Sequence, residues 1–250
     1  MEQPQYIVQM NNIYKSFNGV KALKDVSINL QKNEVVGIVG HNGAGKSTLI
    51  KILSGALHKD TGSILIENKQ VEISDPKAAR NMGIETIYQD LALAGNLDVA
   101  SNFFLGNEKS RFFFLRNKFM KEESKRVLQE MKINIKSYSV PVDFLSGGQR
   151  QAIAIGRAIY NKAKVLIMDE PTAALGIEET RMVGDLINQL KKQDIGIFLI
   201  SHDIHDVFDF CDRIAILKNG ELVDICISDE VTKDDVVSLI IKGTKEARHR

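Results

Sequence analysis

The chain has 250 residues, 44% of them hydrophobic and 26% charged, which is the balance of a globular protein and not of a disordered or fibrous one. Its 33 basic and 32 acidic residues nearly cancel, so no overall positive field favours a nucleic-acid partner. The two cysteines have neither metal-type nor disulfide-type spacing and indicate a reducing compartment, and no apolar run approaches the roughly 18 residues of a membrane span.

Short alternating segments fill the first third of the chain, at Tyr6 to Met10, Val26 to Leu30 and Ser63 to Glu67. They are separated by turn residues and predict an antiparallel sheet. Among them, Glu34 to Val39 is a continuous apolar run that leads through a glycine loop into an apolar helix, Lys46 to Ala56. This order of elements predicts one half of a parallel β–α unit.

From about residue 91 to residue 160 the pattern is helical, and no run in this segment is convincing as a strand. Strand patterns return at Val165 to Met168 and Ile197 to Ile200, separated by a helix over Glu178 to Gln193. A parallel sheet with crossover helices requires this alternation. After it, the pair Asn219-Gly220 predicts a two-residue hairpin turn, and a last helix follows.

The residues GHNGAGKS match the phosphate-binding pattern G-x-x-x-x-G-K-[ST], with a strand before and a helix after. Glycines let the backbone wrap phosphates, Lys46 brings positive charge to the outer phosphates, and the Ser47 hydroxyl can bind Mg²⁺. The alternative is a glycine-rich turn that only joins strand to helix, but the spacing and both flanks favour phosphate binding. The predicted nucleotide-binding residues are Gly40, His41, Asn42, Gly43, Ala44, Gly45, Lys46, Ser47 and Thr48.

Two acids, Asp169 and Glu170, stand at the carboxyl end of a predicted strand, where open α/β sheets bind ligands. Successive strand residues point in opposite directions, so the two acids should have different functions. We expect Asp169 to hold Mg²⁺ and Glu170 to act as the general base that polarises water for in-line attack on the γ-phosphate. The alternative is a pair of acids that caps the turn before Pro171.

The stretch LSGGQ, Leu145 to Gln149, opens another predicted helix. Ser146 and Gln149 form a capping box, but Gly147 and Gly148 weaken a first helical turn, so we expect something to approach the backbone closely there. A helix start attracts anions, which makes this a second phosphate cradle. We predict that two chains pack head to tail and enclose a nucleotide between the glycine loop of one and the LSGGQ helix of the other.

With these motifs in this order, the sequence resembles the ATPases of the ATP-binding cassette (ABC) transporter family over essentially its whole length. The resemblance implies an α/β fold with a P-loop NTPase (RecA-like) core and a parallel sheet. It also implies an N-terminal antiparallel β-subdomain and an inserted α-helical subdomain. We therefore expect a single domain over residues 1–250, in which parts 1–90 and 161–250 flank a helical signature subdomain at about 91–160.

The resemblance also implies roles for single residues. Gln89 in IYQD is similar to the glutamine that joins the Mg²⁺ shell and senses the membrane partner, and His202 in LISHD resembles the histidine that contacts the γ-phosphate and orients the attacking water. Phe17 in KSFNG matches the aromatic residue that stacks on adenine, with Tyr14 as the second candidate and a core aromatic as the alternative. The residues that would contact the partner chain's nucleotide are Ser146, Gly147, Gly148 and Gln149.

One departure concerns Gly176, where the family usually has an aspartate that helps to couple the two sites. The sequence PTAALGIEET around it, together with YQDLALAGNLDVASNFFLG, resembles the ATPases of bacterial monosaccharide importers of the ribose, xylose and fructose type. Many of these carry two cassettes in one chain. We therefore expect this single cassette to pair with a second copy of itself or with a related subunit.

The resemblance implies an ATPase that uses ATP and Mg²⁺ at the cytoplasmic face of the membrane and powers a transmembrane sugar permease, served indirectly by an external sugar-binding protein. ABC import of another substrate class is the alternative. A cassette ATPase of ribosomes or DNA is a further class, but its tandem cassettes, long coiled-coil insertions and basic surface are not found in this sequence. Intact Lys46, Glu170 and His202 argue against a non-hydrolysing regulatory subunit.

Six of the eleven phenylalanines, at positions 103, 104, 112, 113, 114 and 119, gather in the helical region. Arg111, Arg116 and Lys118 flank the later ones, and such clustering indicates a partner or a local core. We expect part of the cluster to line the groove in which the permease docks, or else to form a small satellite core under the helices. Direct insertion of the cluster into lipid is the third and least favoured interpretation.

Overall fold

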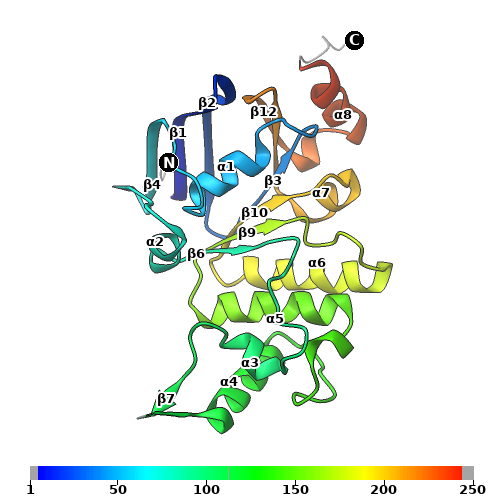
Figure 1. Ribbon diagram of the computed structural model, residues 1–250. Coiled ribbons are helices and arrows are strands. Elements are labelled where there is room, and N and C mark those ends of the chain that lie inside the picture. The colour runs from blue at the N-terminus through cyan, green and yellow to red at the C-terminus, as the bar shows by residue number, and fades with distance from the viewer. Residues whose placement is uncertain (1–4, 112, 244–250) are drawn as a thin grey trace.

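A six-stranded sheet forms the centre of the protein in the computed structural model, which describes residues 5–111 and 113–243 (Figure 1). The strand order is β12-β11-β3-β10-β9-β6, with parallel pairing throughout except for the antiparallel edge strand β12. Strands β3 and β10 are buried at every position, as expected of parallel strands covered on both faces. The strands are β3 (Val35–Val39), β6 (Ile84–Ile87), β9 (Val165–Asp169), β10 (Gly196–Ile200), β11 (Arg213–Lys218) and β12 (Glu221–Ile227).

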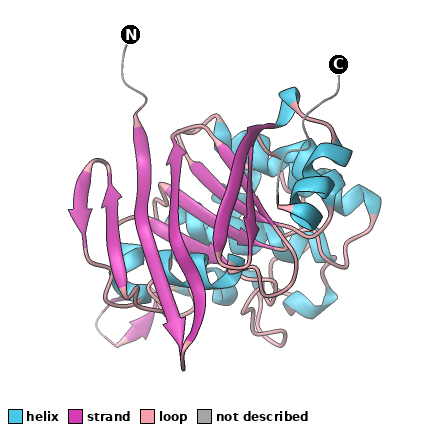
Figure 2. Cartoon of the chain, turned by 90° about the horizontal axis from the view of Figure 1, so that it is seen from above, coloured by secondary structure: helices cyan, strands magenta, loops and turns pink. Residues whose placement is uncertain are grey.

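A four-stranded antiparallel sheet in the order β2-β1-β4-β5 stands beside the central sheet (Figure 2). Its presence was predicted, but β1 and β2 run for 12 residues each, well beyond the predicted segments. Shifts in their register let the strands continue past Asn12 and Asp25, which both have positive φ and interrupt the alternating pattern. The strands are β1 (Tyr6–Phe17), β2 (Val20–Gln31), β4 (Thr61–Ile66) and β5 (Lys69–Val71).

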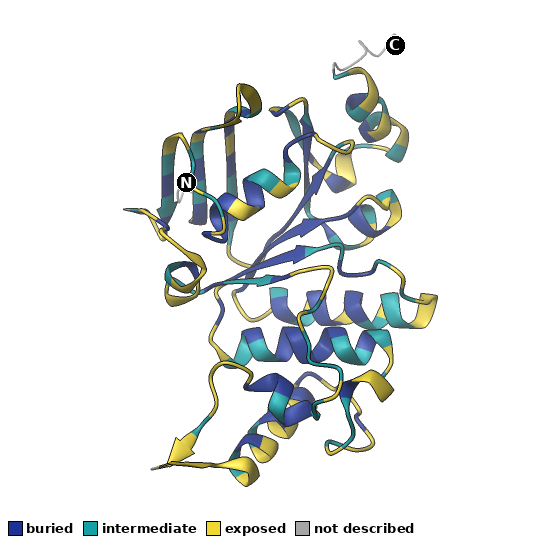
Figure 3. Ribbon diagram, viewed as in Figure 1, coloured by how far each residue is buried: buried dark blue, intermediate teal, exposed yellow. Residues whose placement is uncertain are grey.

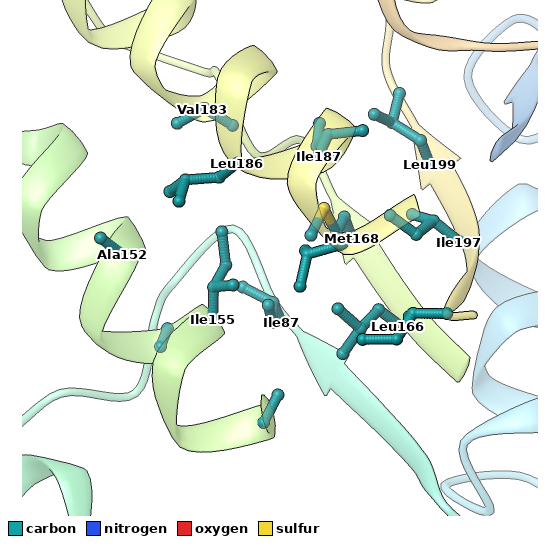
Figure 4. Close-up of a cluster of buried hydrophobic side chains, with 14 of the residues drawn as sticks. Ile87, Ala152, Ile155, Leu166, Met168, Val183, Leu186, Ile187, Ile197 and Leu199 are labelled. Carbon is teal, nitrogen blue, oxygen red and sulfur yellow. The ribbon is translucent and has the colours of Figure 1, made fainter. Parts of the chain in front are cut away.

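Helices cover both faces of the central sheet, and alternate strand residues divide between the two sides. Val36 and Ile38 face the antiparallel sheet and α1, whereas Leu166 and Met168 face α5 and α6 (Figure 4). Within residues 5–111 and 113–243, none of the helices combines the length and apolar character that a membrane span needs. The helices are α1 (Lys46–Leu53), α2 (Pro76–Asn81), α3 (Val99–Phe103), α4 (Asn117–Glu130), α5 (Gly147–Tyr160), α6 (Ile177–Lys191), α7 (Ile204–Phe210) and α8 (Lys233–Lys242), with 3₁₀ turns η1 (Val142–Phe144) and η2 (Ser228–Glu230).

The segment from residue 91 to residue 160 contains α3, α4 and α5, as the helical pattern predicts. It also contains a small antiparallel hairpin of β7 (Ser110–Arg111) and β8 (Phe114–Leu115), which was not predicted. Two residues per strand are too few for an alternating pattern to be recognised. The expectation of helices alone in this segment is therefore wrong at the hairpin.

The phenylalanine cluster divides into a buried and an exposed part (Figure 3). Phe103 and Phe104 are each 1% exposed and pack against Tyr160, with ring centroids 5.7 and 4.9 Å apart. Phe113 and Phe114 are 99% and 81% exposed, and Phe112 lies outside the described residues. The expectation that the cluster lines a docking groove is wrong for the first pair, because hydrophobic burial places these rings in the core.

Candidate functional site

The carboxyl ends of four parallel strands meet at one edge of the central sheet. The strand register aligns Ile38 of β3, Ile200 of β10 and Asp169 of β9 in one row, and β6 ends beside β9. Chain segments that leave parallel strands at this edge form the ligand sites of open α/β sheets. The sequence-predicted residues in these segments are Gly40, Glu170, His202 and Gln89.

The glycine loop between β3 and α1 is packed too closely for side chains at two of its positions. A Cβ atom on Gly40, whose φ is 153°, would lie 2.2 Å from the carbonyl oxygen of Leu217. A Cβ atom on Gly45, whose φ is 108°, would lie 2.8 Å from the carbonyl oxygen of Ala22. Glycine is therefore required at both positions by the backbone conformation and by the neighbouring chain.

Helix α1 begins directly after this loop with an uncapped first turn. Among the residues that the structure describes, no side chain accepts a hydrogen bond at its N-cap, and its first turn contains no acidic residue. The free N–H groups and the positive end of the helix dipole are therefore available to an anion. Ser47 is exposed and Thr48 partly exposed on this first turn.

The side chain of Lys46 folds back over the glycine loop. Its Nζ donates to the carbonyl oxygens of Gly40 and His41 at 2.6 and 3.2 Å. Burial lowers the pKa of Lys46, and the charges of Glu170 and Asp169 oppose this shift. The loop, the lysine and the two acids therefore form one electrostatic group.

Asp169 is the last residue of β9, and Glu170 begins the turn that follows. Glu170 has a φ of 53°, and its backbone N–H donates to the carbonyl oxygen of Ile200 at 2.9 Å. Glu170 therefore lies in a left-handed turn outside the strand, so the strand pleating from which different functions were predicted does not set the direction of its side chain. Burial and the charge of Glu170 raise the pKa of Asp169, while Lys46 lowers it.

Glu170 and His202 make a direct contact across the ends of β9 and β10. The Nδ1 atom of His202 lies 2.6 Å from Oε2 of Glu170, and the backbone N–H of His202 donates to the same oxygen at 3.4 Å. The hydrogen bond and the charge of Glu170 raise the pKa of His202. The Glu170 side chain is only 15% exposed, whereas that of His202 is 74% exposed. The pair can therefore hold a proton at the edge of the site.

A buried contact supports this pair and was not predicted from the sequence. Thr172 Oγ1 donates to Asp206 Oδ2, and both residues are buried. This bond joins the loop after Glu170 to α7, which begins shortly after His202. Burial raises the pKa of Asp206. The two residues are 34 positions apart, so no local pattern announces their contact.

The predicted capping box opens α5. Ser146 Oγ accepts from the backbone N–H of Gln149 at 3.3 Å, and Gln149 Oε1 accepts from the backbone N–H of Ser146 at 3.1 Å. Gln149 Nε2 also donates to the carbonyl oxygen of Asn134 at 3.0 Å. The start of this helix is therefore fixed by its own residues.

The glycines of LSGGQ are in close contact with α6 and the loop before it in the same chain. A Cβ atom on Gly147 would lie 2.5 Å from Cδ2 of Leu175, and one on Gly148 would lie 2.1 Å from Cε of Met182. The backbone N–H of Gly148 also donates to Glu179 Oε1 at 3.4 Å. The backbone of these glycines is approached closely, as expected. In the single chain the approaching groups are α6, the loop before it and the carboxylate of Glu179.

The two cradles belong to helices on opposite faces of the central sheet. Leu49 and Ile52 of α1 lie in the core on one side, and Ala152 and Ile155 of α5 lie in the core on the other (Figure 1). The start of α5 meets the start of α6 and not the glycine loop. One chain therefore does not bring its two cradles onto a single ligand.

Phe17 lies at the end of β1 near the glycine loop, and Gln89 lies in the exposed segment after β6. The Phe17 ring is 41% exposed, with Nζ of Lys15 lying 5.4 Å from its centre. Phe17 pairs with Val20 at the start of β2, and Ala22 on the same strand contacts Gly45. Phe17 is therefore not a core residue, and Tyr14 is 40% exposed as well.

A glycine loop that requires its glycines, an uncapped helix beside a lysine, and a carboxylate–histidine pair at the same strand edge define a nucleoside-triphosphate-hydrolysing α/β protein. Residues 23–173 match the family model described as ABC transporter, and the chain belongs to this family as one of its ATP-binding, ATP-hydrolysing cassettes.

Two curated proteins and one solved structure show what the chain is similar to. The xylose/arabinose import ATP-binding protein XylG of Sulfolobus acidocaldarius is 46% identical over 87% of this chain and 86% of its own length. The ribose import ATP-binding protein RbsA of Clostridium tetani is 40% identical over 94% of this chain but only 46% of its own length, so the chain spans about half of that relative.

The solved structure is MJ1267 in its ADP conformation, described as an ATP-binding cassette of an ABC transporter. It is 27% identical, with a TM-score of 0.79, and the match covers 94% of this chain and 95% of that one. The predicted α/β fold with a parallel sheet and an antiparallel β-subdomain is confirmed.

Proposed function

We propose that the chain is the ATP-hydrolysing subunit of an importer that carries a monosaccharide through a separate membrane permease, and that it works at the cytoplasmic face of the membrane. The proposal of ATP hydrolysis rests on the 2.6 Å contact between Glu170 and His202 beside the glycine loop. The import names of the relatives support the sugar as substrate, and XylG does so over nearly its whole length. We propose that the chain forms one ATPase domain, in which residues 91–160 are the helical signature subdomain.

The nucleotide would bind at the uncapped start of α1. The backbone N–H groups of residues 40–48 surround the phosphates, and Lys46 exchanges its contacts with the loop carbonyls for the outer phosphates. Phe17 offers an exposed aromatic face on the neighbouring hairpin, on which adenine would stack. The close packing at Gly40 and Gly45 keeps the loop in the shape that this contact needs.

The residues at this edge also fit a magnesium ion. Ser47, Asp169 and Gln89 offer hydroxyl, carboxylate and amide oxygens, the donor set of a hard cation, and Asp169 is half-buried close to the glycine loop. These three residues would hold Mg²⁺, which when bound neutralises charge on the outer phosphates. The chain's own contribution is to fix these oxygens at the ends of strands and on the first turn of α1.

Hydrolysis would use Glu170 as the base. Its carboxylate takes a proton from the attacking water while the oxygen of that water bonds to the γ-phosphorus. The bond from the γ-phosphorus to the β–γ bridging oxygen breaks, so ADP leaves with that oxygen and inorganic phosphate is formed. His202 holds one carboxylate oxygen and stands, largely exposed, where it can donate to the γ-phosphate. The buried Thr172–Asp206 bond keeps both segments in position.

A second cassette would complete each site. Because α1 and α5 lie on opposite faces of the sheet, the second phosphate cradle has to come from another chain. We infer a head-to-tail dimer, with an identical or a related subunit, in which Ser146, Gly147, Gly148 and Gln149 of one chain close on the nucleotide of the other. ATP then joins the two subunits, and its hydrolysis releases them.

The permease would dock in a groove between α2, the segment after β6 and α5. This groove has a volume of about 720 Å³. Its lining includes Lys77 and Arg80 of α2, Tyr88 beside Gln89, and Arg157 of α5. A short permease helix in this groove would contact the segment that carries Gln89 and so sense the state of the nucleotide. An external sugar-binding protein would act on the permease and not on this chain.

The test is the Glu170→Gln variant, with Glu122→Gln on the exposed face of α4 as the matched control. The Glu170 variant should bind ATP, accumulate as a dimer and lose ATPase activity by roughly 10²–10⁴-fold, because the base is gone while the binding residues remain. The control should hydrolyse ATP at the wild-type rate. If the Glu170 variant hydrolyses ATP at the normal rate, Glu170 is not the general base. If the wild-type chain is inactive, a regulatory subunit is favoured.

A further inference from the structure

A short hairpin projects from the helical part of the chain, next to α4 (Figure 1). We call its described residues, 109–111 and 113–118, the arm. Its two strands pair Ser110 with Leu115 and Arg111 with Phe114. Residues 110, 111 and 113–118 of the arm are exposed, and Lys109 is partly exposed (Figure 3). The shape of the arm is thus set by backbone pairing and not by packing on the core.

The tip of the arm presents large apolar side chains to solvent. Phe113 is 99% exposed, Phe114 81% and Leu115 54%, whereas Phe103 and Phe104, a few positions earlier, are 1% exposed. The first part of the phenylalanine cluster therefore packs in the core, whereas Phe113 and Phe114 are exposed to solvent. Three consecutive large apolar side chains held in water at one hairpin indicate an interaction site.

Positive charge is concentrated around these side chains. The arm contains four basic residues and no acidic one, whereas the whole chain has a net charge of only +1, so the remainder of the chain is net acidic. The Arg116 guanidinium stacks 4.4 Å from the centre of the Phe119 ring, and Lys109 Nζ donates to the amide oxygen of Asn107 at 3.0 Å. Neither contact neutralises the charge. The basic residues are Lys109, Arg111, Arg116 and Lys118.

The arm begins at the border of the groove in which we place the permease. Asn107 lines that groove, and the arm starts two residues later. In Figure 1, α2, which forms the other border of the groove, lies on the same side of the molecule as β7. If the permease occupies the groove, as the proposed function states, the arm is held close to the membrane in which the permease lies.

We propose that the arm binds the surface of a membrane that contains anionic lipid. Phe113 and Phe114 insert at the level of the headgroups, and the basic residues around them pair with lipid phosphates. A stable protein interface buries about 800 Å² on each partner, far more than two strands of two residues can offer. Interfacial membrane binding needs only a few aromatic side chains and neighbouring positive charge, which is what the arm provides.

Vesicle flotation with the full chain tests this proposal. The wild type should float with phosphatidylcholine vesicles that contain phosphatidylglycerol, bind pure phosphatidylcholine more weakly, and lose the difference at high salt. The double variant Phe113→Ser/Phe114→Ser should bind the anionic vesicles roughly tenfold more weakly or worse, because two apolar side chains no longer leave water. Arg116→Gln should weaken binding roughly fivefold, and only on anionic vesicles.

The matched control is Phe144→Ser, which removes a phenylalanine that is 80% exposed but lies outside the arm. It should bind anionic vesicles as the wild type does. Equal losses in the control and in the double variant, or no flotation of the wild type, would overturn the proposal. If the wild type does not float and the double variant instead fails to assemble with the permease in lipid-free micelles, the arm binds the permease and not lipid.

The basal ATPase activity of the purified chain separates this proposal from the proposed function. The double variant should hydrolyse ATP at the wild-type rate, since the arm contains no residue of the nucleotide site. An active chain that does not bind vesicles overturns the arm proposal alone. A chain that floats but does not hydrolyse ATP overturns the proposed function and leaves lipid binding established.

Discussion

Phe104 and Phe113, nine residues apart in the sequence, should differ strongly in the stability that each loses on substitution by alanine. Phe104 is 1% exposed, packs edge-on against Tyr160 with centroids 4.9 Å apart, and lies 5.4 Å from Phe103 in a tilted pair. Phe113 is 99% exposed. The perturbation is Phe104→Ala, with Phe113→Ala as the matched change in an environment without packing.

The magnitude for Phe104→Ala follows from the cavity that it leaves. Truncation of a buried phenylalanine to alanine costs about 3–5 kcal/mol, which includes the lost transfer free energy and the empty volume. Part of this cost is the loss of two aromatic pairs, at about 0.5–1.5 kcal/mol each. Phe113→Ala removes no packed neighbour and should change the free energy of unfolding by less than about 0.5 kcal/mol.

The assay is equilibrium unfolding in urea, followed by far-ultraviolet circular dichroism for the wild type and both variants. The Phe104 variant should have a lower midpoint and an unchanged slope, since the surface exposed on unfolding stays similar. Its melting temperature should fall by roughly 6–20 °C, given about 2–4 °C for each kcal/mol in a chain of this size. A loss below about 1 kcal/mol at Phe104, or an equal loss at Phe113, would refute the assignment of these rings to core and surface.

Three further predictions concern the site and its supports. Glu170 raises the pKa of His202 above its ordinary 6.5, so the Glu170→Gln variant should lower the His202 midpoint measured by NMR. A group whose pKa is higher in the folded state contributes stability below its pKa in the unfolded state, and this contribution is lost as the pH rises through its pKa in the folded state. The variant should therefore lose about 0.2–1 kcal/mol of unfolding free energy near pH 6, the range of an exposed ion pair, and nothing near pH 9. Asn102→Ala should cost about 1–3 kcal/mol in urea and expose the amide of Ala94 to hydrogen exchange, because the buried Asn102 amide holds that N–H at 2.7 Å. Gly148→Ala should cost about 1 kcal/mol or less in urea in the chain without nucleotide, because the atom that its Cβ would meet most closely, Met182 Cε, ends a flexible side chain that can move; a loss of several kcal/mol would contradict this.

The parallel core could be predicted because its signals are local. Apolar runs, glycine turns and helical periodicity identify β3, α1, β9, α6 and β10 to within a few residues. The predicted end of α1 at Ala56 was too late, since Gly55 takes a φ of 74° against the backbone of Asp75 and the helix ends at Leu53. Contacts with a distant segment decided that boundary, and the sequence does not display them.

The site shows the same division between local and distant signals. The glycine loop and LSGGQ are contiguous motifs, so their residues could be proposed from spacing alone. The bond between Thr172 and Asp206, and the contact of Glu179 with Gly148, join segments more than 30 residues apart. The first depends on the position of α7, and the second on the packing of α5 against α6. Contiguous motifs therefore indicate candidate nucleotide-binding residues, whereas the contacts that hold these residues in place come from the fold.

The two helix starts differ in a way that orders the steps of the proposed cycle. The start of α1 has no cap and no acid, so its N–H groups are available to phosphate as soon as ATP arrives. At the start of α5, Ser146 already satisfies one N–H group and Glu179 accepts from Gly148 and from Gly176. Phosphate at α5 has to compete with that carboxylate, whose pKa these hydrogen bonds lower. Nucleotide should therefore bind the glycine loop first, and the second chain should close on it only afterwards.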